Sequence, residues 1–321
     1  MCGHSMIMRL LREWTLPVAI ATGTVAYLAF HFIPQLDAPG DRIGPLFDAL
    51  LPMLLFLTLF TTFCKVDFRH VRPHRWHAGV LLAQLLLVAA IVGVVIAVQG
   101  HGGHKLLAEA VLTCVIGPSA AATPVVAGKL GGDIATMTTY TLLSALASAL
   151  MIPLVFPLLE QTVHVDFLAA FLIILRKVAL VLLLPLLLGW LVQHFAHTIS
   201  QRIAAIPDLG FYLWSVTLSI TTGITVKNIV HSEASTKLLT AIAAATLATC
   251  FVQFALGRAI GRRLGEEVNS GQALFQKNTA LSIWVAYMYL QPVASIGAGC
   301  YVLWQNIVNS LEIHQEAHPK K

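Results

Sequence analysis

The chain has 321 residues, of which 57% are hydrophobic and only 11% are charged, and its mean hydropathy is +0.80. An ordinary soluble domain carries about 25% charged residues, so this composition excludes a soluble globular protein and indicates an integral membrane protein. The formal net charge is +5, but the basic residues cluster in short loops beside apolar runs. We therefore interpret them as determinants of membrane topology and not as a nucleic-acid surface.

Apolar runs of about 20 residues, the length of helix that crosses about 30 Å of hydrocarbon, recur along the whole chain. The first run follows Arg9 and Arg12 and exceeds the apolar core of a signal peptide, so we expect a retained helix, with a cleaved leader as the alternative. Residues 166–177 are too short to span alone, and we expect them to lie in the membrane interface before the sixth span. Ten membrane spans are predicted, at residues 15–34, 44–64, 76–99, 106–127, 133–158, 176–193, 209–227, 236–257, 271–290 and 293–310.

The basic residues set the expected orientation. With the N-terminus inside, thirteen Lys and Arg residues fall in inside segments and six in outside segments, and Lys277 is the remaining one of the 20. The positive-inside rule then favours a multi-pass protein of the cell (inner) membrane with both termini cytoplasmic. Because five spans from an inside start end outside, the two halves would run in opposite senses. The expected fold is an all-α polytopic membrane protein of ten transmembrane helices in two inverted five-helix repeats.

The fourth span, within LTCVIGPSAAATPVVAGKLGGD, contains residues that interrupt a helix. Pro118 and Pro124 each remove a backbone donor and clash with the preceding turn, and Gly117 adds backbone freedom. Irregular backbone at membrane depth is tolerated only where it is buried in protein or lines a wet cavity. The sequence therefore predicts a broken helix, with a kinked packing helix whose small residues 119–122 permit close approach as the alternative.

The ninth span is interrupted by polar residues in the sequence FQKNT, which runs from Phe275 to Thr279. On an intact lipid-facing helix, four consecutive polar side chains could not all avoid lipid. A charge at the centre of a span costs about 2.5 to 3.5 kcal/mol on insertion scales, so Lys277 is a candidate functional residue; a structural ion pair is the alternative. Interrupted helices at matching positions of two halves indicate a transporter binding site near the midplane.

Several of these segments resemble the bile acid:sodium symporter family, as a divergent bacterial-type member. The stretch FCKVDFRHVRPHRWHAGVLLAQLLL is similar to a basic cytoplasmic loop and a following helix with a buried glutamine, here Gln84. GPSAAATPVVAGKLGGDIATMTTY is similar to the family's first crossover, LLLPLLLGWLV to its Pro-x-x-x-Gly helix, and FQKNTALS to its second crossover. The resemblance covers nearly the whole chain.

The resemblance implies one transporter domain of ten helices. Its panel would comprise residues of about 15–64 and 167–230, and its core residues of about 76–160 and 236–310, with the broken fourth and ninth helices crossing inside the core. It also implies a secondary transporter that carries a small organic anion between panel and core by a rocking or elevator-like motion. Helix N-termini at the crossing suit anions because partial positive charge gathers there.

Only part of the family's sodium-ligand set is present. Gln84, Thr123 and Thr141 fall where the resemblance places a glutamine, a serine and a threonine ligand. In the second crossover, Asn278 remains from a Gln-Asn pair.

Four positions depart from that set. Pro124 stands where an asparagine is expected, and Met137 stands where a serine is expected. Ala273 occupies the position of the usual ligating glutamate, and Lys277 that of a glutamine. Sodium, like other hard cations, prefers oxygen ligands, so the resemblance implies that the ordinary sodium sites are lost.

The economical hypothesis is that the Lys277 ammonium takes the place of one sodium ion. Coupling would then be absent, or would use protons if burial favours the neutral amine. The first alternative is a sodium-coupled symporter with a rearranged site built from Gln84, Thr123, Thr141 and main-chain carbonyls. The second is a membrane sensor or binding protein that does not transport.

No enzyme is expected, since no His/Glu metal motif or Ser/Lys dyad on adjacent helices is evident. We expect no cofactor, metal or nucleic-acid partner, while sodium is left open and a proton remains an option; the partners are the organic anion and the lipid bilayer. The expected substrate-binding residues are Lys277, Asn278, Thr279, Thr123, Pro124 and Ser119. The expected remnant of an ion site is Gln84, Thr123, Thr141 and Gln276.

Overall fold

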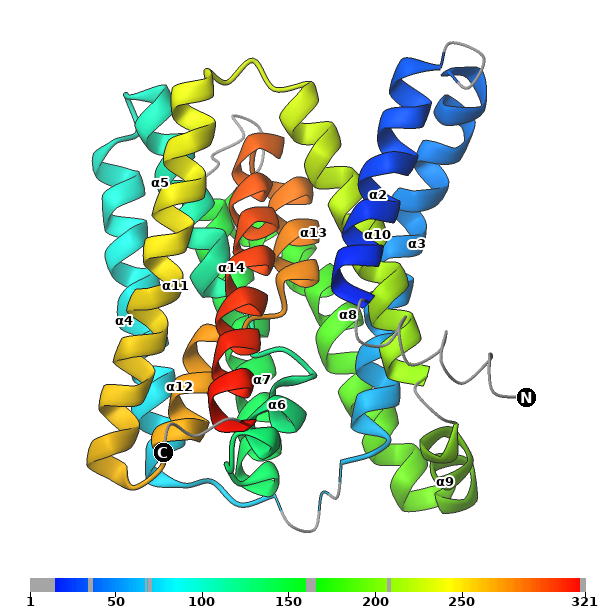
Figure 1. The fold of residues 1–321 in the computed structure, drawn as a ribbon, viewed down its shortest axis with the longest axis vertical. Coiled ribbons are helices and arrows are strands. Elements are labelled where there is room, and N and C mark those ends of the chain that lie inside the picture. The colour runs from blue at the N-terminus through cyan, green and yellow to red at the C-terminus, as the bar shows by residue number, and fades with distance from the viewer. Residues whose placement is uncertain are drawn as a thin grey trace.

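The computed structural model describes residues 15–33, 37–66, 68, 71–159, 166–206 and 209–317. Within these ranges every named element is an α-helix, and the one β feature is an isolated bridge. Expectations that rest on residues 1–14, 34–36, 69 and 318–321, including the two ends of the chain, lie outside the described residues. The helices, drawn in Figure 1, are α2 (Thr15–Phe32), α3 (Asp37–Phe63), α4 (Arg75–Ala97), α5 (Gly102–Ile116), α6 (Thr123–Lys129), α7 (Ile134–Leu159), α8 (Phe167–Phe195), α9 (His197–Ala205), α10 (Leu209–Val230), α11 (Thr236–Leu264), α12 (Glu267–Phe275), α13 (Thr279–Tyr289) and α14 (Pro292–Ala317).

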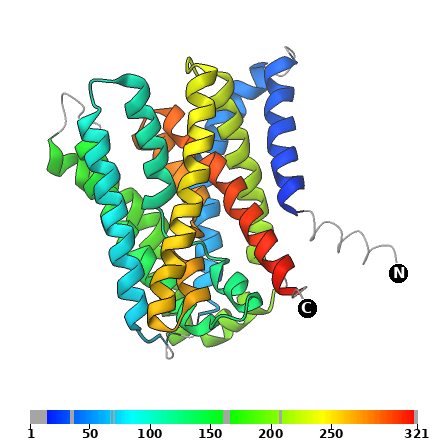
Figure 2. The ribbon, with the colours of Figure 1, turned by 60° about the vertical axis from the view of Figure 1, so that its left-hand side comes forward.

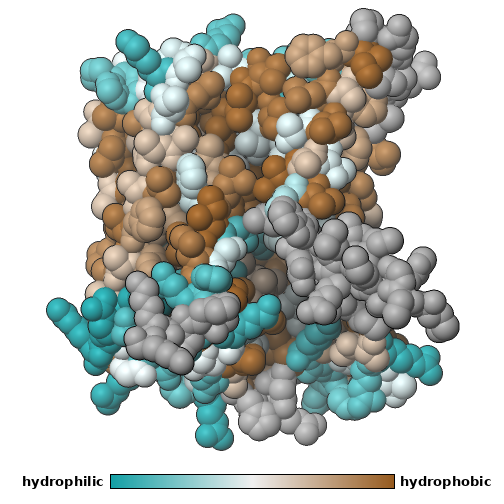
Figure 3. Space-filling model, viewed as in Figure 1, coloured by the Kyte–Doolittle hydropathy of each residue, from teal (hydrophilic) through white to brown (hydrophobic). Residues whose placement is uncertain are grey.

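Long apolar helices dominate the molecule. In the described part of the chain, α4, α7, α8 and α11 are each long and apolar enough to cross a membrane, and shorter apolar helices lie at Pro17–Phe32 and Ala49–Phe63. Figure 3 shows hydrophobic side chains over the middle of one face and hydrophilic side chains along its lower end and at its upper left. These features are those of a polytopic integral membrane protein.

Both predicted interruptions are present. The fourth predicted span is divided into α5, which ends at Ile116, and α6, which begins at Thr123. The ninth is divided into α12, which ends at Phe275, and α13, which begins at Thr279. The alternative of a merely kinked fourth helix is therefore wrong.

Residues 166–177, which were predicted to lie in the membrane interface before the sixth span, do not form an element of their own. These residues continue without a break into the sixth predicted span and form the 29-residue helix α8. The physical reason is local, because no glycine or proline separates Phe167 from the apolar run until Pro185. Helix α9, which follows directly, was not among the predicted elements.

The helices form two groups that stand side by side in Figure 1. The first group comprises α2, α3, α8 and α10, in which α10 packs on α2 and α3, and α3 packs on α8. Gly23 on α2 permits close approach, since a Cβ at this position would collide with the backbone carbonyl of Ser219 on α10. We call this set the first helix group.

The second helix group comprises α4 to α7 and α11 to α14. Helix α11 packs on α12, α14 and α5, and α14 packs on α5 and α13. Figure 2 shows α14 crossing obliquely between α11 and α10. A cluster of buried side chains that includes Phe63, Ile152, Val178 and Trp284 joins α3 and α8 of the first group to α7 and α13 of the second.

Loops fall at two opposite ends of the bundle. Helix α4 begins and α11 ends at the lower end of Figure 1, where α9 also lies, whereas α5 begins and α10 ends at the upper end. The described loops that the basic residues assign to the inside therefore lie at one end, and those assigned to the outside at the other. This separation is what a membrane-spanning bundle requires.

Candidate functional site

The two helix breaks meet each other. Ser119 of the first break and Lys277 of the second form an isolated antiparallel bridge. The amide of Ala120 donates to the carbonyl of Gln276 at 2.9 Å, and the amide of Asn278 donates to the carbonyl of Pro118 at 2.8 Å. The broken segments thus satisfy each other's backbone groups as two very short strands would, and this pairing fixes the centre of the second helix group.

Gln84 on α4 supports the end of α5. Its amide nitrogen donates to the carbonyls of Val115 and Gly117, each at 3.0 Å, and the side chain is fully buried. Helix ends leave their last carbonyls without partners inside the helix. Gln84 therefore supplies donors where α5 stops.

Two serines on α7 complete the support of the first break. The hydroxyl of Ser148 donates to the carbonyl of Ile116 at 3.0 Å. The hydroxyl oxygen of Ser144 accepts from the amide of Ser119 at 2.7 Å. Backbone groups that α5 cannot satisfy are thereby bonded to side chains of two neighbouring helices.

Gln305 on α14 supports the second break. Its Oε1 accepts from the amide of Lys277 at 3.0 Å, and its Nε2 donates to the carbonyl of the same residue at 3.2 Å. One primary amide therefore satisfies both backbone groups on the side of Lys277 that faces away from the first break. Asn278 then caps α13, because its Oδ1 accepts from the amide of Leu281 at 3.2 Å.

The side chain of Lys277 is almost completely enclosed. Only 1% of it is exposed, and its Nζ has no hydrogen-bond partner among the described residues. A buried ammonium without a partner is costly, and natural interiors rarely keep one without a use. The structure thus places a buried amine at the crossing of two broken helices.

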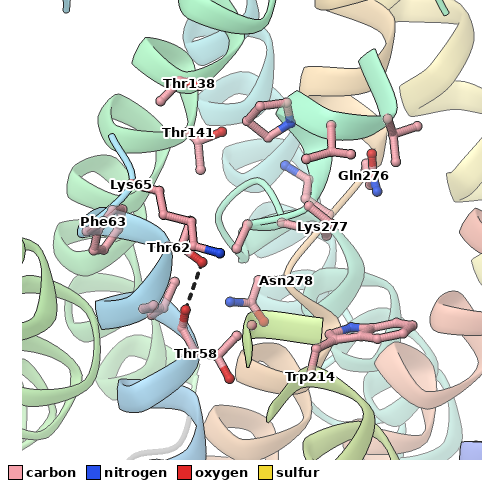
Figure 4. A pocket seen from close by; sticks show the side chains of 18 of the residues that line it. Thr58, Thr62, Phe63, Lys65, Thr138, Thr141, Trp214, Gln276, Lys277 and Asn278 are labelled. Atoms are coloured by element: carbon pink, nitrogen blue, oxygen red, sulfur yellow. Dashed lines mark hydrogen bonds between the residues drawn. The ribbon is translucent and has the colours of Figure 1, made fainter. Parts of the chain in front are cut away.

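A cavity of about 990 Å³ opens beside the crossing, between the first and second helix groups. Figure 4 shows side chains from α3, α7, α10 and the second break turned toward it. None of the described residues that line it is an aspartate or a glutamate. Its polar and charged lining residues are Thr58, Thr61, Thr62, Lys65, Lys129, Thr138, Thr139, Thr141, Trp214, Thr217, Gln276, Lys277, Asn278, Thr279, Gln305, Asn306, Asn309 and Ser310.

Some of the predicted site residues line this cavity, and others lie behind it. Among the lining residues are Pro124, Thr141, Gln276, Lys277, Asn278 and Thr279. Ser119, Thr123 and Gln84 are buried at the crossing and are not among its lining residues. The hydroxyl of Ser119 donates to Thr123 Oγ1 at 3.1 Å, so these two side chains bond to each other.

The positions that the resemblance assigns to lost sodium ligands are apolar in their surroundings. Ala273 and Met137 are fully buried and belong to one hydrophobic cluster with Trp76, Tyr140 and Leu274. The cluster fills the space beside the crossing with carbon atoms. A hard cation finds no oxygen from these two side chains.

Several lining residues were not predicted from the sequence. Gln305, Asn306 and Asn309 form a polar stripe on α14, and Thr62 and Lys65 come from the end of α3 and the segment after it. The spacing of the three amides in WQNIVNS was a usable signal, because they interrupt an apolar run at helical intervals. Lys65 gave no such signal, since it looked like one more basic residue of an inside loop.

Comparison with known proteins agrees with this architecture. No curated protein matches the chain. A sequence model described as the Sodium Bile acid symporter family matches residues 52–232, which is more than half of the 321 residues. The matched region includes the first broken helix and most of the helices that enclose the cavity on the side of the first group. The chain therefore belongs to the sodium bile acid symporter family of membrane transporters.

Proposed function

We propose that the protein is a secondary transporter that moves a small organic anion across the membrane without ordinary sodium coupling. Membership of a symporter family supports the transport. The observation that carries the rest of the proposal is the buried amine of Lys277, which has no hydrogen-bond partner among the described residues and belongs to a residue that lines the cavity. An anion in the cavity would supply the missing negative charge.

The proposed mechanism uses the two helix groups as panel and core of one ten-span domain built from inverted repeats. Each half would contribute one broken helix, and both termini would be cytoplasmic. The cavity lies between the groups, so a rocking or elevator-like movement of the second group against the first would expose it to one side and then the other. Transporter sites at crossings of broken helices commonly work in this way.

The packing at two positions and the amine of Lys277 support the loss of ordinary sodium coupling. Ala273 and Met137 are packed in a hydrophobic cluster, so neither position supplies an oxygen ligand. The Lys277 ammonium would then act as a cation built into the protein, and proton coupling would result if the amine releases its proton during the cycle.

A second candidate is a sodium-coupled symporter with a rebuilt cation site. The observation that favours it is Oε1 of Gln84, a buried oxygen that has no hydrogen-bond partner among the described residues. Together with Thr123, Thr141 and main-chain carbonyls it would offer oxygen ligands to a small cation. Sodium dependence distinguishes the two candidates.

The test is the melting temperature of the purified protein in detergent, with sodium exchanged for potassium or choline at fixed ionic strength. A ligand that binds only the folded state stabilises it by about 2.7 kcal/mol at a hundredfold excess over its dissociation constant. We expect no sodium shift in the wild type and a sodium shift in Lys277→Gln, because the substitution removes the competing charge and adds an oxygen.

The matched control is Lys237→Gln, which removes an exposed lysine that does not line the cavity. It should behave as the wild type does. A clear sodium shift in the wild type would overturn the proposal of a built-in cation and favour the rebuilt sodium site.

A further inference from the structure

Three lysines from three different segments line the cavity. Lys277 belongs to the second break, Lys65 follows α3, and Lys129 ends α6. Lys277 is buried, whereas Lys65 and Lys129 are exposed. No carboxylate stands among the lining residues that the structure describes, so positive charge in the cavity is not balanced by its own wall.

Lys65 extends into the cavity. In Figure 4 its side chain runs from the end of α3 toward Asn278, which is the neighbour of Lys277 at the second break. Lys65 belongs to the first helix group and Lys277 to the second. The two lysines therefore approach the same space from opposite sides.

Neither lysine has an acidic partner in the described ranges. The ion pairs found there join Lys105 to Glu109, Arg258 to Glu267 and Glu312, and Arg262 to Glu267. Both lysines line the cavity, and two ammonium groups near one another repel each other more strongly as the surroundings become less polar. A ligand with a single negative group would neutralise only one of them.

We propose that the substrate is a dicarboxylate, an anion with two separated carboxylates, which bridges Lys277 and Lys65. This inference rests on the proposed transport of an organic anion and narrows its substrate class. One carboxylate lies beside the crossing near Lys277, and the other is held by Lys65. Charge-assisted hydrogen bonds at each end fix the length of the ligand.

Other parts of the cavity lining suit a carbon chain. Leu59, Ala120, Ala121 and Trp214 contribute apolar surface to the same cavity. Carbon atoms of a spacer would contact these side chains while the two charged ends reach the amines. A ligand that binds Lys277 with one carboxylate and Lys65 with the other would also hold the two helix groups in one arrangement.

Lys65 also counts as an inside residue under the positive-inside rule, and that role makes a different prediction. If Lys65 serves only membrane topology, its substitution in a correctly inserted protein does not change which anions bind. If Lys65 binds the second carboxylate, its substitution removes the preference for dicarboxylates over monocarboxylates.

The test compares ligands of matched length on the purified full-length protein in detergent. The probes are succinate, glutarate and adipate, the monocarboxylates butyrate, valerate and hexanoate, and inorganic sulfate, which carries two charges on one small group. Dissociation constants come from titration calorimetry at fixed pH and ionic strength. We expect one dicarboxylate to bind roughly tenfold tighter than the monocarboxylate of equal carbon number, as one added charge-assisted bond provides.

Substitutions of Lys65 test whether this residue binds the second carboxylate. Lys65→Gln is expected to weaken the preferred dicarboxylate roughly tenfold and to leave the monocarboxylates within about twofold, while Lys65→Arg keeps the preference. Lys65 is exposed, so neither change removes buried packing. Lys237→Gln serves as the control for loss of a lysine outside the cavity.

The outcomes separate this inference from the proposed function. If monocarboxylates bind as tightly as dicarboxylates, or if sulfate binds as tightly as the best dicarboxylate, the proposed dicarboxylate site is overturned while anion transport stands. If Lys65→Gln keeps the full preference for the dicarboxylate, Lys65 does not bind the second carboxylate and the inference is overturned. If none of the anions binds, the inference and the proposed function both fail.

Discussion

The two helix breaks that meet at the crossing arise from different causes. The first break, residues 117–122, begins with Gly117 and Pro118, and Pro124 follows at the start of α6. The second break is only residues 276–278 and contains neither glycine nor proline. The first break is therefore encoded by local backbone preferences, whereas the second exists because of the partners around it.

Their hydrogen-bond partners show the same difference. The first break is supported by side chains of α4 and α7, from Gln84, Ser144 and Ser148. The second is supported by the backbone of the first break and by two side chains of α14, those of Gln305 and Tyr301. The backbone pairing serves both breaks equally, but side chains of only one neighbouring helix, α14, support the second break, so it should be the more fragile of the two.

The largest effect is expected from Gln305→Leu. The substitution leaves the buried amide of Lys277 without an acceptor and removes one of two donors to its carbonyl, which keeps its bond from the amide of Thr279. An unsatisfied buried amide costs up to about 3 kcal/mol, so we expect a loss of about 3 kcal/mol in the free energy of unfolding. Denaturant unfolding in mixed micelles, followed by tryptophan fluorescence, measures it.

The matched control for this change is Asn306→Ala on the same helix. Asn306 bonds only the carbonyl of Val302 within its own helix among the printed contacts of the described residues, so its loss should cost less than about 1 kcal/mol. Equal losses for the two substitutions would contradict the special dependence of the second break on Gln305.

A smaller effect is expected from Gln84→Leu. It removes the donor to the carbonyls of Val115 and Gly117. A carbonyl that lacks a partner is tolerated better than an orphaned amide, and Pro118 keeps the chain from forming a regular helix in any case. We expect a loss of about 2 kcal/mol, measured by the same unfolding experiment. A loss greater than that of Gln305→Leu would reverse the ranking of the two breaks.

The same contrast explains what the sequence could reveal. Gly117, Pro118 and Pro124 act on the backbone within a few residues, so the first break was predictable from local chemistry. The polar run at 276–279 predicted the second break indirectly, because polar side chains at membrane depth need partners. In both cases a one-dimensional signal was sufficient to locate the interruption.

The partners of the breaks were not predictable in the same way. Gln305 lies 28 residues from Lys277 in the chain, and no local preference links an amide on α14 to that backbone. Lys65 likewise carries the signature of a topology signal, and only the packing of α3 against the second group brings it to the cavity. Tertiary contacts between distant helices decide which polar residues form the site. Ser119 and Thr123, which were predicted to bind substrate, instead form a hydrogen bond with each other.

The smallest effects are expected from substitutions of two serines one turn apart on α7. They test whether an unpaired amide and an unpaired carbonyl at the first break cost different amounts of unfolding free energy. Ser144→Ala leaves the amide of Ser119 without its acceptor, and Ser148→Ala leaves the carbonyl of Ile116 without a donor. Both serines are fully buried, so the change in packing is the same. Because a carbonyl has two lone pairs and an amide has one hydrogen, we expect losses of about 1.5 kcal/mol for Ser144→Ala and about 0.5 to 1 kcal/mol for Ser148→Ala. Unfolding of the single and double variants would show additive losses if the two serines act separately. A larger loss for Ser148→Ala would mean that the carbonyls at the end of α5, and not the amide inside the bridge, limit the stability of the first break.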